Sequence, residues 1–178
     1  MQIEELKYPI GKYKPNKEPS PEQLKEWIGH IEGFPEQVDK LLASVTIEML
    51  SWRYRPEGWT IQQLVHHCAD SHMNSLIRFK LALTEEEPTI KPYDEGSWAV
   101  LPDTTPDALE ASLLMIKGIH KRWGLLLHSL TIEQLQRSYI HPEHGAKFNL
   151  AETVGMYAWH CDHHLAHMQQ AIHSKGKY

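Results

Sequence analysis

Histidine is the residue type whose chemistry stands out in this chain of 178 residues, which contains 13 of them. Four lie within eight positions, as His160, His163, His164 and His167. Imidazole is the most common metal ligand in proteins and changes its protonation near neutral pH. A dense histidine group therefore suggests a metal site or a proton carrier, provided that the spacing brings the rings together.

Two pairs in this group have a spacing that lets a helix present both rings to one ion. Residues four apart share a helix face, which pairs His160 with His164 and His163 with His167. Apolar residues of the segment 150–172 recur with helical spacing and mark its core-facing side. At about 100° per residue, His164 lies near the edge of that side, His160 just outside it and His163 almost opposite. The first pair is the better candidate, although an HxxxH pattern alone more often marks a solvated face.

A third ligand would have to come from another helix, and the segment 61–83 offers His66, His67 and His72. Periodicity places His72 closest to the middle of the apolar side of that segment. His67 instead belongs to a polar line formed by Gln63, His67, Ser71, Asn74 and Arg78. That line is either a solvent face, with His72 a hydrogen-bonded core histidine, or the wall of a polar pocket inside the protein. The residues alone leave both interpretations open.

Four long helices are predicted to carry these histidines, because the signals for helix starts are strong and those for strands are weak. Four helices of this length in one small domain predict an all-α four-helix bundle, in which side chains on facing helices converge on a metal. The predicted helices run from Ser20-Pro21 to about Ser44, from Thr60 to about Leu83, from Thr105-Pro106 through Leu127, and from Asn149 to about His173.

The remaining segments organise the chain as a single domain over residues 1–178. Residues 1–19 contain three prolines and are predicted to form an extended N-terminal arm. The proline-rich segment 85–105 is long enough to be a functional loop or a crossover connection. Residues 41–50 also resemble residues 126–135, and each copy leads through Tyr, Pro-Glu and Gly into a capped, histidine-containing helix. This echo predicts two similar helical hairpins, each with a short helix before its second long one.

Composition excludes several classes of protein. The formal net charge is −5 and the pI is about 6.2, which does not suit binding to nucleic acid. The apolar runs are too short to span a membrane, and the N-terminus lacks the apolar core of a secretory signal. Cys68 and Cys161 are expected to be reduced, buried thiols of a cytoplasmic protein.

The chain resembles the YfiT-like group of the DinB superfamily. The segments that carry the resemblance are 8–11, 59–74, 78–81 with 84–86, 92–94 and 159–167. The resemblance implies an up-down-down-up bundle with short additional helices, which is often a homodimer. It also implies one zinc or nickel ion held by His67, His160 and His164, so it selects His67 over His72.

Three neutral imidazoles and an open position are typical of a catalytic metal site, although these ligands suit zinc, nickel or copper. Asp70, one turn from His67, is a weak candidate for a general base; the alternatives are a surface carboxylate or a salt bridge with Arg78. Tyr157, the tryptophans and Cys161 are interpreted mainly as core, and Asp162 as pointing away.

The resemblance leaves three hypotheses about function. The first is a metal-dependent hydrolase of an unidentified small molecule, since a suitable metal makes hydroxide available at neutral pH. The second is a metal-dependent S-transferase that uses a low-molecular-weight thiol, since coordinated thiols lose their proton. The third is a non-enzymatic metal-binding stress protein.

Overall fold

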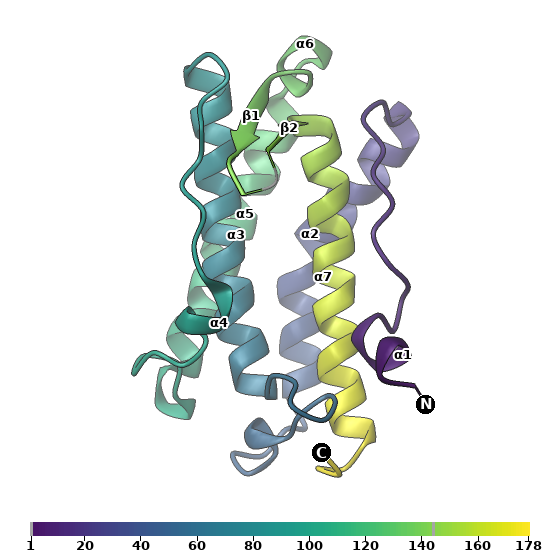
Figure 1. Ribbon diagram of the computed structural model, residues 1–178, viewed down its shortest axis with the longest axis vertical. Coiled ribbons are helices and arrows are strands. Elements are labelled where there is room, and N and C mark those ends of the chain that lie inside the picture. Colours follow the sequence, from purple (N-terminus) through teal and green to yellow (C-terminus); the bar gives the residue numbers. More distant parts are fainter. Residues whose placement is uncertain (1, 144) are drawn as a thin grey trace.

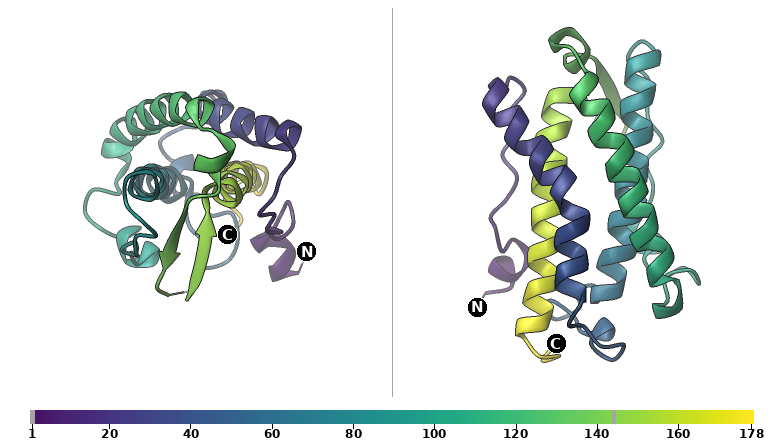
Figure 2. Two further views of the ribbon diagram at one scale, coloured as in Figure 1. Left: turned by 90° about the horizontal axis from the view of Figure 1, so that it is seen from above. Right: turned by 180° about the vertical axis from the view of Figure 1, so that it is seen from behind.

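Four long helices form the body of the protein in the computed structural model, which describes residues 2–143 and 145–178. Helices α2 and α7 run in one direction and α3 and α5 in the other (Figure 1). Both α2 and α3 pack against α5 and α7, so α2 and α3 lie diagonally opposite each other (Figure 2). This is the predicted all-α bundle with up-down-down-up order. The long helices are α2 (Pro21–Leu42), α3 (Ile61–Thr84), α5 (Leu109–Ser129) and α7 (Leu150–His173).

The predicted capping residues begin three of the four helices. The side chains of Ser20, Thr60 and Asn149 each accept a hydrogen bond from the backbone N–H three residues on. The predicted start of the third long helix is three residues too early. Thr105 makes no such bond, so Pro106 opens a single 3₁₀ turn, η2 (Pro106–Ala108), and α5 begins after it. The predicted ends of α2, α3 and α7 agree with the structure to within two residues.

Short elements fill the connections between the long helices. They are α1 (Ile3–Lys7), the 3₁₀ turn η1 (Met49–Ser51), α4 (Glu95–Trp98), α6 (Ile132–Leu135) and an antiparallel hairpin of β1 (Ser138–His141) with β2 (Ala146–Asn149). The hairpin was not predicted, because strands of four residues are too short for an alternating pattern to stand out. None of the described helices is both long and apolar enough to cross a membrane.

The similarity between residues 41–50 and 126–135 corresponds to a repeated supersecondary unit. The turn η1 precedes α3 as the short helix α6 precedes α7. An isolated antiparallel bridge between Arg53 and Thr60 takes the place that the β1–β2 hairpin has before α7. The predicted short helical element before each second long helix is therefore present, and α3 and α7 are equivalent, but the two long helices of each unit lie diagonally across the bundle and do not pack as a hairpin.

The N-terminal arm contains α1 and otherwise runs along α7 without regular structure (Figure 1). The Tyr13 hydroxyl donates a hydrogen bond to the carbonyl of Glu152, and the Trp159 indole N–H donates one to the carbonyl of Gly11. The arm therefore covers a side of α7 that periodicity assigned to solvent. His163 is 7% exposed and His167 is 2% exposed, so the alternative interpretation of a solvated histidine face is wrong.

The connection from α3 to α5 is a crossover. Because these two helices point the same way, the chain must return along the whole bundle before α5 begins (Figure 1). On its way it covers α3: the Gln63 side chain donates a hydrogen bond to the carbonyl of Ala99, and a ring nitrogen of His66 lies 3.1 Å from the carbonyl oxygen of Thr105. The crossover therefore encloses residues that would otherwise face solvent.

Candidate metal centre

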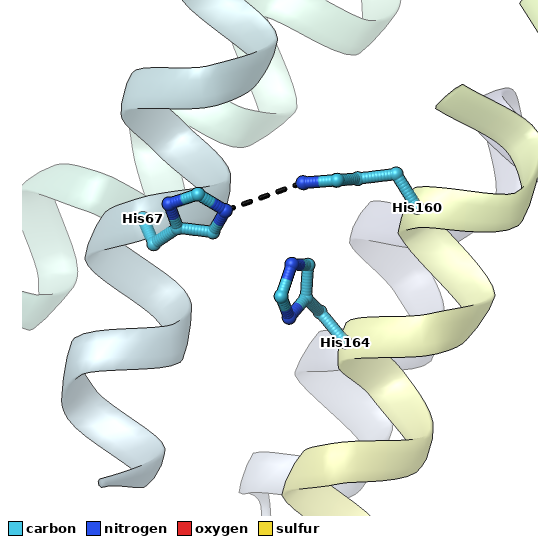
Figure 3. Close-up of side chains that lie close together, drawn as sticks. All are labelled: His67, His160 and His164. Atoms are coloured by element: carbon cyan, nitrogen blue, oxygen red, sulfur yellow. Dashed lines mark hydrogen bonds between the residues drawn. The ribbon is translucent and has the colours of Figure 1, made fainter. Parts of the chain in front are cut away.

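Three histidines from two neighbouring antiparallel helices point toward one another between α3 and α7 (Figure 3). His67 comes from α3, and His160 and His164 come from successive turns of α7. One ring nitrogen from each lies within 4.8 Å of the other two, and the Nε2 atoms of His67 and His160 are 3.2 Å apart. His67 and His164 are buried, and His160 is partly buried.

The geometry of these nitrogens fits a divalent transition metal. A tetrahedral ion with ligand bonds of about 2.1 Å holds its ligand nitrogens about 3.4 Å apart. The separation of 3.2 Å between the Nε2 atoms of His67 and His160 is close to that value, and the ligand nitrogen of His164 lies within 4.8 Å of both. Three nitrogen ligands leave at least one position for water or substrate, as in catalytic sites.

Burial keeps these histidines in the form that binds metals. It lowers the pKa of His67 to about 4, and it holds the pKa values of His160 and His164 well below the ordinary value. Neighbouring histidines lower these pKa values further, because one charged imidazole would repel the next. All three rings are therefore neutral at pH 7, so a metal does not have to compete with the second proton of an imidazolium.

His72, which periodicity favoured over His67, lies directly behind the three-histidine group. It is fully buried, and its Nε2 atom is 3.0 Å from Nδ1 of His160. The polar line of α3 is also inside the protein, since Ser71 and Arg78 are buried and the Tyr157 hydroxyl donates a hydrogen bond to the carbonyl of Ser71. The interpretation of this line as a solvent face is therefore wrong.

A second group of buried side chains, His72, His120 and Cys161, also has its potential ligand atoms within 4.8 Å of one another. Two of these atoms, Nδ1 of His72 and Nε2 of His120, are only 2.7 Å apart. That is a hydrogen-bond distance and is shorter than the separation of two nitrogens on one ion. Burial also raises the pKa of the Cys161 thiol well above its ordinary value. This group is a hydrogen-bonded cluster with a protonated thiol.

The other two histidines of the α7 cluster, His163 and His167, are not part of the three-histidine group. His163 stacks on Trp159 with ring centroids 4.2 Å apart, and His167 stacks on Tyr54 at 3.9 Å. The Nε2 atom of His167 donates to the carbonyl of Lys7. Of the two pairs with the right spacing, the structure brings to His67 the one that lies nearer the apolar side of α7.

Asp70 and Asp162 lie near the three-histidine group in sequence, but neither contacts His67, His160 or His164 in the structure. Asp70 lines a cleft with His66 and Asp103, where burial and the neighbouring carboxylate raise its pKa to about 6. Arg78 lines a different cleft beside Glu95, so the salt-bridge alternative for Asp70 is not supported. Asp162 pairs with His30 through atoms 2.7 Å apart and points away, as expected. The role of Asp70 as a general base stays a prediction.

An open cleft of about 430 Å³ leads to the metal centre from the side of His164. The Trp59 ring lies 4.6 Å from the ring of His67 and 6.4 Å from that of His164, and it forms part of the cleft wall. Sequence reasoning assigned Trp59 to packing, although its place directly before the Thr60 cap puts it two turns from His67. The lining residues are Lys7, Tyr8, Tyr54, Arg55, Glu57, Trp59, His163, His164 and His167.

The two cysteines are free and buried, as expected. Burial raises the pKa of both thiols, so neither is a nucleophile at neutral pH.

Comparison with known proteins gives consistent results. The family model of the DinB superfamily matches residues 30–168. Proteins of Bacillus cereus (strain 03BB102) and Bacillus thuringiensis subsp. konkukian (strain 97-27), each named "Putative metal-dependent hydrolase", are 46% identical over 166 residues, which are 93% of this chain and 95% of theirs.

Two solved structures share the fold. YfiT from Bacillus subtilis, described as "a probable metal-dependent hydrolase with an unusual four-helix bundle topology", is 43% identical with a TM-score of 0.93 over 97% of this chain and 98% of that chain. A mycothiol-dependent maleylpyruvate isomerase is 17% identical with a TM-score of 0.65 over 82% of this chain and 60% of that chain, a likeness of fold alone.

Proposed function

Because this chain belongs to the DinB superfamily, we propose that it is a metal-dependent hydrolase whose metal is held by His67, His160 and His164. The observation that carries the proposal is the convergence of three neutral imidazoles beside an open cleft. A divalent ion in such a site acidifies water and polarises carbonyl or phosphoryl oxygens. The ligand set suits zinc or nickel, and we propose one such ion per chain.

The residues around the cleft give the site its selectivity for a small molecule. The rings of Tyr54 and Trp59 offer apolar walls next to His164, while Lys7, Arg55 and Glu57 place charges of both signs near them. A volume of about 430 Å³ suits a metabolite-sized substrate rather than a folded protein. Trp59 also shields His67 from water on the cleft side.

Hydrolysis and thiol transfer are distinguished by one co-reactant. We expect the metal-loaded protein to hydrolyse members of a panel of small esters, amides and phosphoesters without any thiol, and to lose this activity when a chelator removes the metal. The same protein is incubated with a reactive electrophile, with and without low-molecular-weight thiols. Strictly thiol-dependent consumption of the electrophile would contradict the hydrolase and favour the S-transferase. If the protein is inactive in every one of these assays and its metal has no open coordination position, the results would favour a metal-binding protein without catalytic activity.

We also propose that the protein is a homodimer that joins through the outer face of α5. Leu114 and Leu125 are 61% and 63% exposed, and their separation of eleven residues places them on one face. Replacing both with glutamate is expected to convert a dimer into a monomer, as measured by light scattering during gel filtration. The matched control is Ile47→Glu, an exposed apolar residue on another segment. A wild-type monomer would contradict the proposal.

A further inference from the structure

A chain of hydrogen-bonded histidines runs from the metal centre into the core and ends on a backbone carbonyl. We infer that His120 and His72 are positioning residues, which fix the tautomer of His160 so that its Nε2 lone pair faces the metal. The inference rests on the metal site of the proposed function and adds a role for two residues that lie outside it.

The chain of hydrogen bonds begins at a defect in helix α2. Pro35 lies inside this helix and has no backbone N–H, so the carbonyl of Ile31 loses the donor that a regular helix would supply. Nδ1 of His120, on α5, lies 2.5 Å from that carbonyl oxygen. Because a carbonyl can only accept a hydrogen bond, Nδ1 of His120 must carry the proton. The proline thus frees an acceptor inside the core, and a histidine uses it.

The proton on Nδ1 of His120 fixes the positions of the protons on the next two rings, because a neutral imidazole has one N–H and one lone pair. Nε2 of His120 must accept, and it lies 2.7 Å from Nδ1 of His72, which therefore donates. Nε2 of His72 must accept in turn, and it lies 3.0 Å from Nδ1 of His160. His160 is left with its proton on Nδ1 and its lone pair on Nε2. This is the atom that lies 3.2 Å from Nε2 of His67.

Burial and packing hold the linking rings neutral and in place. Both rings are fully buried, so a charge on either of them would have to lose its hydration. Phe34, the neighbour of Pro35, stacks on the ring of His120 with centroids 5.4 Å apart and meets the ring of His72 edge-on at 5.3 Å. The ring of Trp123 also lies near both, with its centroid 6.0 Å from that of His120 and 6.2 Å from that of His72. The rings therefore have little freedom to flip.

The row of hydrogen-bonded histidines orients the metal ligand His160 and does not conduct protons. His72 and His120 are 0% and 1% exposed, and the last acceptor is an amide carbonyl, which does not take up a proton near neutral pH. A proton that entered from His160 would have no exit.

His164 shows a weaker version of the same arrangement. Nε2 of His167 donates to the carbonyl of Lys7 at 3.0 Å, which leaves Nδ1 of His167 as an acceptor. It lies 3.5 Å from Nδ1 of His164, at the outer limit of a hydrogen bond. Both α7 ligands thus have Nδ1 facing an acceptor and Nε2 free, but only the contact of His160 is short.

The tautomers can be read directly from long-range ¹H–¹⁵N correlation spectra of the metal-free protein. We expect His160, His72 and His120 all to carry the proton on Nδ1. This measurement needs no variant, so it tests the inference even if a substitution impairs folding. A proton on Nε2 of His160 in the wild-type spectrum would overturn it.

The variant His120→Phe removes the link to Ile31 while it keeps an aromatic ring in the core. We expect the preference of His160 for the Nδ1 proton to disappear and zinc affinity, measured by competition with a chromophoric chelator, to fall about 10- to 100-fold. The control His163→Phe replaces another buried histidine of the same cluster and should keep both properties. Unchanged zinc affinity in folded His120→Phe would contradict the inference. A second outcome would also contradict it: the wild type binds two equivalents of zinc and His120→Phe binds one. The group of His72, His120 and Cys161 would then be a metal site.

Both readouts are independent of turnover. A wild-type protein with the expected tautomers and a zinc affinity that depends on His120, but without hydrolytic activity, would contradict the proposed function and support the positioning role.

Discussion

Replacing His67, His160 or His164 with alanine is expected to abolish stoichiometric binding of zinc or nickel. Four-ligand structural zinc sites bind with about 10–16 kcal/mol, or about 3 kcal/mol per ligand. Loss of one ligand therefore corresponds to a decrease in affinity of about 100-fold or more, and hydrolysis should fall with it. The measurements are isothermal titration of the metal-free variants and metal analysis of the purified proteins.

His163→Ala and His167→Ala are the matched controls for these variants. Both residues are buried on the same helix, but they lie outside the three-histidine group, where their rings stack on Trp159 and Tyr54. They should retain one metal ion per chain. Full metal retention in any one of the three ligand variants would refute the assignment of that residue.

The metal-free protein is expected to unfold in mild acid, near pH 5. Five histidines at and behind the metal centre have pKa values that burial holds below the ordinary value of about 6.5; these are His67, His72, His120, His160 and His164. Below pH 6.5 the unfolded chain takes up protons that the folded chain excludes, so stability falls as the pH falls toward about 4. At pH 5 each histidine costs about 2 kcal/mol, and five cost about 10 kcal/mol, which is comparable to the whole stability of a domain.

Far-ultraviolet circular dichroism as a function of pH measures this transition in the presence of a chelator. Saturating zinc should shift the midpoint to lower pH, because the ligands cannot be protonated without releasing the ion. His173→Gln, which removes an exposed histidine from the end of α7, should leave the midpoint unchanged. A metal-free protein that stays folded to pH 4 would contradict the expected loss of stability from these histidines.

The four long helices could be predicted because their signals are local. The Ser20, Thr60 and Asn149 caps lie within three residues of the groups they bond, and the core spacing of α7 lies within one helix. The same locality explains the choice of His160 with His164, which depends on a separation of four residues and on the position of the pair beside the apolar side of its own helix.

The surroundings of the site could not be predicted because they depend on contacts between distant segments. Periodicity placed His163 almost opposite the apolar side of its helix, but the N-terminal arm covers this region through bonds such as that of His167 to Lys7, 160 residues away. His72 could be placed in the core but not against His160, and the choice of His67 came from the family resemblance. Pro35 was the one local signal for the positioning chain: a proline inside a helix marks a carbonyl without its usual donor, but nothing in the sequence shows which side chain takes it.

The placement of the ligands on α3 and α7 also bears on how the chain loses its structure. His67 and His160 are 93 residues apart in sequence, so an ion that binds both closes a loop of about half the chain. Closing a loop of about 100 residues with a covalent link restricts the unfolded ensemble by about 4–5 kcal/mol on a chain-entropy basis. A metal that remains attached to both halves as the bundle opens would act as a removable cross-link of this kind. A chelator would then loosen this protein in the way that a reducing agent loosens one held by a disulfide.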